Sequence, residues 1–398
     1  MSEQWEWPRK TLSEVGDLVR GRRFTKNDYV ESGLGCIHYA QIHTDFEATA
    51  RDPLTFLAED SRARMRLAHS GDLVIAATSE NVDDVGKAVA WLGDDDVAVH
   101  DDCYIFRHNF NPAYVSYFFA SSLFHSQKIK YVSETKVVRI SGANLGRIEI
   151  PVPPQRMQER IVEVVGAVDD QIVALRDEAD ALEGVYRAAT SLLWRTAEGG
   201  EAESQFLGDV MHLDVVRTPM DAGTTYRLAG VLNAGKGLVD KDTFDGADTE
   251  YPAMNVLREN RVVMRKLTAW EGPITVVPAK FAGFVASSEF PTFTLAAGLA
   301  PGWMKHVCRT PRLWAEMQSR VVGTVQRRKR LNPDQLLSLA LPIPSRPEQE
   351  QTAEVLDAVE GQISVIRTEA ARLRGIRARL LSGLLDGTID IESAEMEV

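Results

Sequence analysis

A stretch of the chain occurs twice, 191 residues apart, and this repeat limits how the chain can fold more than any other feature. Both copies open with closely spaced prolines followed by a Gln-Glu pair: Pro151, Pro153, Gln158 and Glu159 in the first, and Pro342, Pro344, Gln349 and Glu350 in the second. Since an internal repeat sets the architecture of a chain, every local pattern has to be interpreted within it.

Each copy continues with apolar residues at alternating spacings of four and three, which is a heptad pattern and favours a left-handed coiled coil. At 1.5 Å per residue, two helices of roughly 38 residues would each be ~57 Å long, and neither could bury its apolar stripe alone. We therefore expect the two helices to pack against each other, antiparallel; two separate surface helices are the alternative. The positions of this seam include Ile161, Val165, Val168, Ile172, Leu175 and Leu182 in the first copy, and Leu356, Val359, Ile363, Ile366, Leu373 and Leu380 in the second. Arg377 interrupts the heptad pattern of the second copy.

The repeat divides the chain into globular, helical, globular and helical segments, so we expect an α+β fold with two α/β domains and a pseudo-twofold internal repeat. The expected bounds are 1–150 for the first domain, 151–195 for the first helix, 196–341 for the second domain with a linker at 196–204, 342–386 for the second helix, and 387–398 for an acidic tail. Within the domains, the apolar runs 36–42, 71–77, 226–231 and 261–266 predict strands. Because the helices stay alike while the domains diverge, we interpret the chain as two different binding domains on one support.

Composition restricts the class of protein. The formal net charge of -12 counts against nucleic-acid binding as a whole-chain property, but a binding surface is local and basic clusters stand apart from the acidic ones. There is no apolar run of about eighteen residues and no signal-peptide pattern, so we expect a cytoplasmic protein without a membrane span. The three scattered cysteines form neither a disulfide framework nor a metal-binding pair.

The order of these segments resembles the specificity subunit of type I restriction-modification systems, over nearly the whole chain. The resemblance rests on 150–154 with Gln158 and Glu159, on 341–344 with residues 348–350, and on the phrases at 71–75 and 266–272. It implies two target-recognition domains that read the two halves of a bipartite double-stranded DNA sequence, held apart by an antiparallel coiled coil. It also implies docking of two DNA methyltransferase (modification) subunits and one restriction/translocase subunit, in phage defence. S-adenosylmethionine, ATP and Mg²⁺ would then belong to the partners, and this chain would hold no cofactor and no active site.

Basic and polar clusters are the candidates for DNA contact, since Lys and Arg bind phosphates and polar side chains read base edges. In the first domain we select a Gly-bearing basic loop, a polar turn after a strand and a second basic run: Arg20, Arg22, Arg23, Lys26, Thr78, Ser79, Lys136 and Arg139. In the second domain the run 327–330 is the densest cluster. The candidates there are Arg217, Arg265, Lys266, Lys280, Arg327, Arg328, Lys329 and Arg330. For each residue the alternative is a solvated surface charge.

Sequence motifs of catalysis are missing: there is no GxxxxGK[ST] or GxGxxG loop, no HExxH and no GxSxG. Asn111–Tyr114 resembles the Asn-Pro-Pro-Tyr loop of adenine methyltransferases but lacks the second proline, and we interpret Pro112 as the start of a helix. Residues 134–136 form a Glu-Thr-Lys triplet that is common by chance. No histidine shows metal-ligand spacing. Two other classes stay open: a coiled-coil scaffold that never binds DNA, and a fused endonuclease or methyltransferase.

Overall fold

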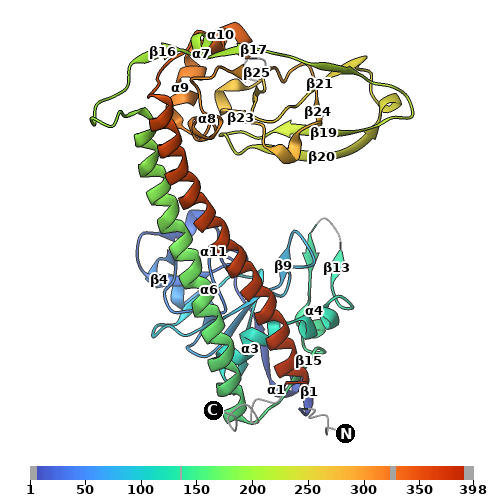
Figure 1. Cartoon of the computed structure of the whole chain (residues 1–398). Helices are drawn as coiled ribbons and strands as arrows, with labels where there is room; N and C mark the ends of the chain where they lie inside the picture. Colours follow the sequence, from blue (N-terminus) through green and yellow to red (C-terminus); the bar gives the residue numbers. More distant parts are fainter. Residues whose placement is uncertain (1–6, 135–136, 323–328, 390–398) are drawn as a thin grey trace. The chain divides into compact units, whose positions relative to one another are not determined.

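A computed structural model describes residues 7–134, 137–322 and 329–389. The chain divides into two compact units, unit 1 with Met1–Arg176 and Thr368–Val398, and unit 2 with Asp177–Arg367. The two long helices are α6 (Gln155–Ala189) and α11 (Arg346–Asp386) (Figure 1). One part of each helix belongs to unit 1 and the other part to unit 2. Among the described residues no helix is both long and apolar enough to cross a bilayer.

Unit 1 is built from two five-stranded sheets, a three-stranded arm, a two-stranded ribbon and short helices. Its strands are β1 (Arg9–Thr11), β2 (Gly16–Arg20), β3 (Tyr29–Val30), β4 (Leu34–Ile37), β5 (Thr49–Ala50), β6 (Thr55–Leu57), β7 (Leu67–Ala68), β8 (Leu73–Ala76), β9 (Thr78–Ser79), β10 (Ala88–Trp91), β11 (Val97–Val99), β12 (Cys103–His108), β13 (Ser133–Glu134), β14 (Val138–Arg139) and β15 (Glu149–Pro151). Its shorter helices are α1 (Leu12–Val15), α2 (Tyr39–Thr44), α3 (Pro112–Phe119), α4 (Ser122–Lys128), α5 (Gly142–Leu145), η1 (Lys26–Asp28) and η2 (Glu59–Arg64).

The central strand β8 shows why unit 1 forms layers. It is buried along its whole length, and successive side chains of a strand point to opposite faces. Val74 and Ala76 pack into the apolar core shared with strands β4, β7 and β11 of the second sheet. Leu73 and Ile75 pack on the opposite face, against α3, α4 and the ends of the two long helices. A run of consecutive apolar residues is therefore required here, since both faces are covered.

Unit 2 contains a four-stranded sheet, a five-stranded sheet and a two-stranded ribbon. Its strands are β16 (Ser204–Phe206), β17 (Met211–Leu213), β18 (Arg217–Pro219), β19 (Thr225–Val231), β20 (Leu238–Asp245), β21 (Ala253–Val256), β22 (Val262–Met264), β23 (Ile274–Val276), β24 (Val285–Ala286), β25 (Thr292–Leu295) and β26 (Ala340–Pro342). Its shorter helices are α7 (Leu207–Val210), α8 (Pro301–Val307), α9 (Pro311–Arg320), α10 (Pro333–Leu337), η3 (Thr190–Trp194), η4 (Gly246–Asp248), η5 (Ala269–Glu271) and η6 (Ala279–Phe281).

The two units share one topology although their sequences diverge. The sheet next to the helices has the order β2-β12-β8-β10 in unit 1 and β17-β25-β22-β23 in unit 2. The ribbons match as well, since β15 and β26 lie 191 residues apart and pair with β1 and β16. Strand β22 alternates as β8 does, with Val262 and Met264 facing the helix side and Val263 facing the second sheet. The loosely repeated plan expected from the sequence is present in both units.

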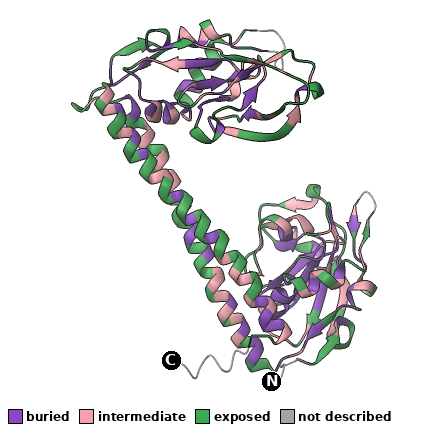
Figure 2. Cartoon of the chain, turned by 45° about the vertical axis from the view of Figure 1, so that its right-hand side comes forward, coloured by how far each residue is buried: buried purple, intermediate pink, exposed green. Residues whose placement is uncertain are grey.

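The heptad positions lie on the covered faces of the long helices (Figure 2). Ile161, Val165, Ile172, Leu175, Leu356, Ile363 and Ile366 are buried, and Val168, Leu182, Val359, Leu373 and Leu380 are half-buried. In unit 1, Asp169 pairs with Arg377 while Ile161 shares a core with Leu385, so the α6 and α11 segments run antiparallel there. The predicted packing of the two helices is confirmed.

A buried glutamine ties the start of each long helix to its domain. Gln158 accepts a hydrogen bond from the Asn111 N–H (2.8 Å) and donates to the Pro153 carbonyl (2.9 Å). Gln349 repeats both contacts, accepting from the Ala300 N–H (2.7 Å) and donating to the Pro344 carbonyl (2.8 Å). Asn111 and Ala300 are the N-caps of α3 and α8, and a proline follows each. The repeated prolines and the glutamine that follows them are therefore the sequence signature of this joint.

A second polar joint has different chemistry in the two units. In unit 1, Arg377 forms a two-pronged ion pair with Asp169, and its guanidinium lies 5.1 Å from the ring centroid of Tyr117 on α3. The arginine that interrupts the heptad pattern therefore forms specific contacts that join α11 to α6 and to the domain. In unit 2, the fully buried His306 of α8 bonds Asp357 of α11 (3.0 Å) and Tyr186 of α6 (2.8 Å). Because a carboxylate only accepts, Nε2 of His306 carries the hydrogen, and Nδ1 accepts from the Tyr186 hydroxyl.

One strand expectation was wrong. The run 36–42 forms strand β4 only to Ile37, and helix α2 follows. His38 is the N-cap, and its N–H donates to the side chain of Gln41 (3.1 Å), which also donates to the hydroxyl of Thr55 (3.1 Å). A capping glutamine three residues into the helix outweighed the strand propensity of the apolar run.

Replacing Gln349 with methionine should destabilise unit 2. The change leaves the Ala300 N–H and the Pro344 and Gly298 carbonyls without their side-chain partner. Since unsatisfied buried groups cost about 1–3 kcal/mol each, we expect a loss of about 2–4 kcal/mol in the free energy of unfolding, measured by denaturant titration. Gln155→Met, at an exposed position, is the control and should change stability by less than about 0.5 kcal/mol. Equal effects of the two variants would contradict the role of the joint.

Acid should destabilise unit 1 through His108. Burial lowers the pKa of His108 to about 4, and its Nε2 has no partner among the described residues. Between pH 6.5 and 4 this histidine is protonated in the unfolded chain, where its pKa is about 6.5, but not in the folded chain. The free energy of unfolding therefore falls as the pH drops from about 6.5 towards 4. Between pH 7.5 and 5 this amounts to about 2 kcal/mol.

The variant His108→Asn isolates this contribution. Asparagine can still accept from the Phe110 N–H, as Nδ1 does at 3.2 Å, but it does not titrate. Urea unfolding of both proteins at pH 7.5 and 5 should show the smaller pH dependence in the variant. The explanation fails if the two pH dependences coincide.

Candidate nucleic-acid interface

Unit 1 carries a three-stranded arm at the end of its central strand. Strand β9 continues from β8 and pairs with β14, which pairs with β13, so that Thr78, Arg139 and Ser133 lie side by side. The Ile140 N–H donates to the Ala77 carbonyl (3.0 Å) and fixes the base of the arm. Arg139 is exposed, Thr78 is half-buried and Ser79 is buried. The structure thus brings two separate predicted segments together.

Unit 2 carries the equivalent arm. Arg330, 191 residues after Arg139, pairs with Leu267 and with Val322. The Leu331 N–H donates to the Lys266 carbonyl (3.0 Å), as the Ile140 N–H does to that of Ala77. Four residues selected in the sequence, Arg265, Lys266, Lys329 and Arg330, therefore lie on one arm, although more than sixty residues of the chain separate the two pairs.

A carboxylate organises the cations of the second arm. Glu289 Oε1 lies 3.6 Å from Lys266 Nζ and 3.4 Å from Arg330 Nη2, and the Lys266 N–H donates to the Glu289 carbonyl (2.9 Å). The Arg330 side chain is 54% exposed, so it remains open to an anion from solvent. Oε2 of Glu289 is buried and has no partner among the described residues. No sequence pattern pairs Glu289 with these cations.

The loop after β22 is clamped by Arg265. Its Nε donates to the Leu267 carbonyl (3.0 Å), and its Nη2 donates to the Asn233 carboxamide (2.8 Å) and the Thr268 hydroxyl (2.6 Å) and lies 3.2 Å from Glu271 Oε2. Thr268 has φ 55° and ψ 32°, a left-handed conformation that costs a β-branched residue about 1–3 kcal/mol. Asn233 and Glu271, which complete this network, were not selected from the sequence.

The basic loop at 20–26 is a separate surface of unit 1. Gly21 and Phe24 are buried and anchor it: a Cβ on Gly21 would come within 2.3 Å of the Val99 carbonyl oxygen, and the Phe24 ring packs 4.7 Å from that of His100. The cations Arg20, Arg22, Arg23 and Lys26 are exposed, and Arg20 donates through Nε to the Asp101 carbonyl (2.8 Å). The arginines at 22 and 23 and Lys26 are thus available for a phosphate.

The remaining candidates lie on other elements. Arg217 is exposed on β18, and Lys280 is exposed on η6 with Nζ 5.4 Å from the Phe281 ring. Lys136, Arg327 and Arg328 lie outside the described residues.

Among the described residues, two groups of carboxylate and histidine side chains meet the geometric requirement for a cation, but their surroundings differ. His306, Asp357 and Glu360 form one group. Lys305 already binds both carboxylates at 2.6–2.7 Å, and Arg309 also pairs with Glu360. The other group is His100, Asp101 and Asp102, whose histidine Nε2 lies 2.9 Å from the Phe24 carbonyl oxygen. These contacts account for both groups as internal networks.

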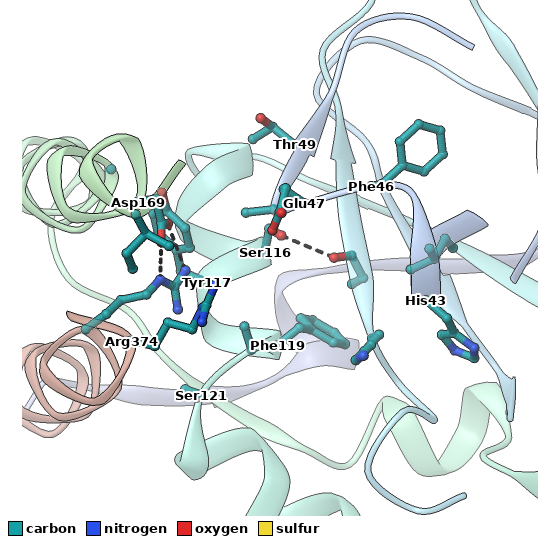
Figure 3. A pocket seen from close by; sticks show the side chains of 18 of the residues that line it. His43, Phe46, Glu47, Thr49, Ser116, Tyr117, Phe119, Ser121, Asp169 and Arg374 are labelled. Atoms are coloured by element: carbon teal, nitrogen blue, oxygen red, sulfur yellow. Dashed lines mark hydrogen bonds and ion pairs between the residues drawn. The ribbon is translucent and has the colours of Figure 1, made fainter. Parts of the chain in front are cut away.

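A hollow of about 710 Å³ in unit 1 lies between the domain and the long helices (Figure 3). Tyr117, Asp169 and Arg374 line it, and burial and the neighbouring Asp169 raise the pKa of Tyr117 to about 12. Acidic and basic side chains alternate here and pair with one another, as Arg176 does with Glu47 (3.3 Å). A phosphate-binding groove needs an excess of positive charge, so the two arms and the loop at 20–26 fit nucleic acid better than this hollow.

Comparisons with known proteins agree with this geometry. The family model of the type I restriction modification DNA specificity domain matches residues 4–183. A specificity subunit of the type I restriction enzyme MjaVIII from Methanocaldococcus jannaschii is 23% identical over 194 residues, which are 47% of this chain and 45% of that protein. The match thus spans less than half the length of that relative.

Solved structures match over nearly the whole chain. A chain from a study of complex assembly and conformational transition of the type I system superposes with a TM-score of 0.61 at 17% identity, covering 96% of this chain and 98% of that one. The type I specificity subunit of M. genitalium superposes with a TM-score of 0.56 at 11% identity, covering 97% of both chains. At these identities the structures show a shared fold.

The family match covers the first domain and its helix, and the shared fold extends over both units and both helices. Residues 4–183 are therefore similar to the type I restriction modification DNA specificity domain, and the chain as a whole shares the fold of the two solved structures.

Proposed function

We propose that this chain is the DNA-reading subunit of a type I restriction-modification complex and that its two domains read the two halves of a bipartite target. The observation that carries the proposal is the pair of equivalent arms. Both present an arginine at the same place in the topology, Arg139 and Arg330, next to segments that differ. The subunit itself has a recognition role and no catalytic one.

The differences between the arms fit two different half-sites. After the central strand, unit 1 has Thr78-Ser79-Glu80-Asn81, and unit 2 has Leu267-Thr268-Ala269-Trp270. Polar side chains distinguish bases by hydrogen bonds in the major groove, whereas apolar ones contact the thymine methyl group. The exposed arginines and lysines would bind phosphates and fix the register on the duplex. One backbone frame with unlike side chains is what a bipartite, asymmetric target requires.

The proposed partners rest on the similarity to type I specificity subunits. We propose that two DNA methyltransferase subunits and a restriction/translocase subunit dock on this chain, and that they hold S-adenosylmethionine, ATP and Mg²⁺. The solved structure with the highest TM-score quoted above comes from a study of complex assembly in a type I system. Since the target is DNA, we expect the complex in the cytoplasm.

Selection from random duplexes by the complex with its methyltransferase tests the proposal. We expect two short fixed sequences separated by a constant spacer. The double change Lys329→Ala and Arg330→Ala should weaken binding, lower the slope of log affinity against log salt by about one per lost phosphate contact, and relax one half-site. Arg139→Ala should relax the other half-site.

Arg367→Ala is the matched control, because its side chain is 55% exposed and pairs with Glu183, much as Arg330 is 54% exposed and pairs with Glu289. This variant should leave the salt slope and both half-sites unchanged. Selection of no sequence at all would favour a scaffold without DNA binding. Turnover by the chain alone with Mg²⁺ or S-adenosylmethionine would favour the fused-enzyme alternative.

The long helices should set the spacer between the half-sites. Inserting seven residues after Arg176 and seven after Arg367 preserves the heptad register and adds ~10 Å to each helix. At ~3.4 Å per base pair, the spacer should grow by about three base pairs, which methylation mapping would show. Insertions of four residues at both points move the apolar stripe out of register and should destabilise the protein instead. An unchanged spacer in the seven-residue variant would exclude the helices as the ruler.

A further inference from the structure

We infer that Arg265 is a positioning residue for one half-site: it holds Thr268 in its left-handed conformation and so places Lys266, Lys329 and Arg330. The inference rests on the proposed DNA-reading function of the second arm. It replaces the expectation that Arg265 contacts DNA directly.

The guanidinium of Arg265 is already committed to the protein. It contacts four oxygens of the loop and its neighbour, at Leu267, Asn233, Thr268 and Glu271, and its side chain is 27% exposed. Asn233 Nδ2 also donates to Glu271 Oε2 (2.8 Å), so the acceptors hold each other in place. A planar fork that satisfies several acceptors at once is a role for arginine and not for lysine. Nε and Nη2 are used in these contacts, which leaves Nη1 for a phosphate or a guanine.

Thr268 is the point on which this clamp acts. Its φ of 55° places the N–H toward the Lys329 carbonyl (3.1 Å) and its own carbonyl toward the Glu271 N–H (2.9 Å). A β-branched residue does not adopt this conformation without support. Without the hydrogen bond from Arg265 to its hydroxyl, Thr268 would relax toward an extended conformation, and the bond to Lys329 would break.

The cations of the arm are attached to this loop on both sides. The Lys266 carbonyl accepts from the Leu331 N–H (3.0 Å), and Thr268 binds the backbone of Lys329, so the segment 329–331 is held between them. Arg330 lies in that segment, paired with Leu267. Moving Thr268 would therefore shift the backbone of Lys329 and Arg330 relative to Lys266. A displacement of this kind leaves the total charge of the arm unchanged. It alters the contacts with bases, because these depend on the positions of the side chains.

Among its described residues, unit 1 has no equivalent of this arginine clamp on a threonine with positive φ, which makes the effect selective. The described non-glycine residues with positive φ are Ala234, Asp242, Asn260 and Thr268, all of them in unit 2. Ser79 occupies the place of Thr268 in unit 1 and has an ordinary backbone. A defect in the Arg265 clamp should thus relax only the half-site that unit 2 reads.

The test is duplex selection by the complex with its methyltransferase, comparing wild type, Arg265→Ala, Thr268→Gly and the double variant. Glycine adopts positive φ at no steric cost, so it removes the need for the clamp. We expect Arg265→Ala to lower base preference in one half-site by about tenfold while the other half-site is unchanged, in the range of one lost base contact. Thr268→Gly alone should keep the preference, and the double variant should recover most of it.

Other outcomes overturn the inference. If Arg265→Ala loses base preference and the double variant does not regain it, Arg265 contacts DNA itself. Equal loss in Thr268→Gly alone would mean that the threonine side chain reads the base. No loss in Arg265→Ala would remove the role altogether. Wild type without any sequence preference would instead refute the proposed function, and the inference with it.

Two further variants separate positioning from general destabilisation. Arg346→Ala removes an arginine of unit 2 that donates to the carbonyls of Ala297 and Leu299, away from the arm. It should lower the thermal stability without changing either half-site. Asn233→Ala removes one acceptor of the clamp and should give a smaller loss in the same half-site, so the idea remains testable if Arg265→Ala folds poorly. Half-site changes in Arg346→Ala would show that stability alone controls preference.

Discussion

The structure depends on a side-chain amide that is buried where each long helix begins. Gln158 and Gln349 each satisfy one N–H and one carbonyl that the turn of prolines and the start of α3 or α8 leave open. A side-chain amide donates and accepts through two atoms on the same carbon, which suits glutamine to both positions. The prolines fix the backbone that carries the carbonyl acceptors. Each domain is thereby oriented on its own helix by local contacts, without reference to the rest of its sequence.

Because the joint is local, the domain beyond it is free to diverge. The polar contact between domain and helices illustrates this: unit 1 uses Arg377 and Asp169, whereas unit 2 uses His306 and Asp357. Burial lowers the pKa of His306, so this joint works with a neutral imidazole, while the other works with a full charge pair. Two unrelated solutions keep the same sheet order and the same arm. Changes in the segments that follow the central strands then have little effect on the stability of the shared fold.

Sequence reasoning was strongest where contacts recur at a fixed period. The heptads predicted the buried faces of both helices, and Arg330, which stands where Arg139 does, lies at the same shift of 191 residues. It failed where one long-range partner decides. Arg377 looked like a defect in the seam until Asp169 and Tyr117 were placed beside it, and residues 38–42 became a helix through the cap at Gln41. Neither Glu289 nor Asn233 has any local pattern that links it to the arm, since both reach it only through the fold.

The arrangement of charge on the second arm reconciles a net charge of -12 with the proposed DNA binding. Glu289 pairs with Lys266 and Arg330 in the free protein, so any phosphate must compete with a carboxylate that is already in place. Competition of this kind lowers affinity for every sequence equally, because it acts on the phosphate contacts. Contacts with base edges then contribute a larger share of the remaining binding free energy. Discrimination between sequences therefore improves relative to non-specific affinity for DNA. A subunit that must find one bipartite site among many gains more from that ratio than from a stronger positive field.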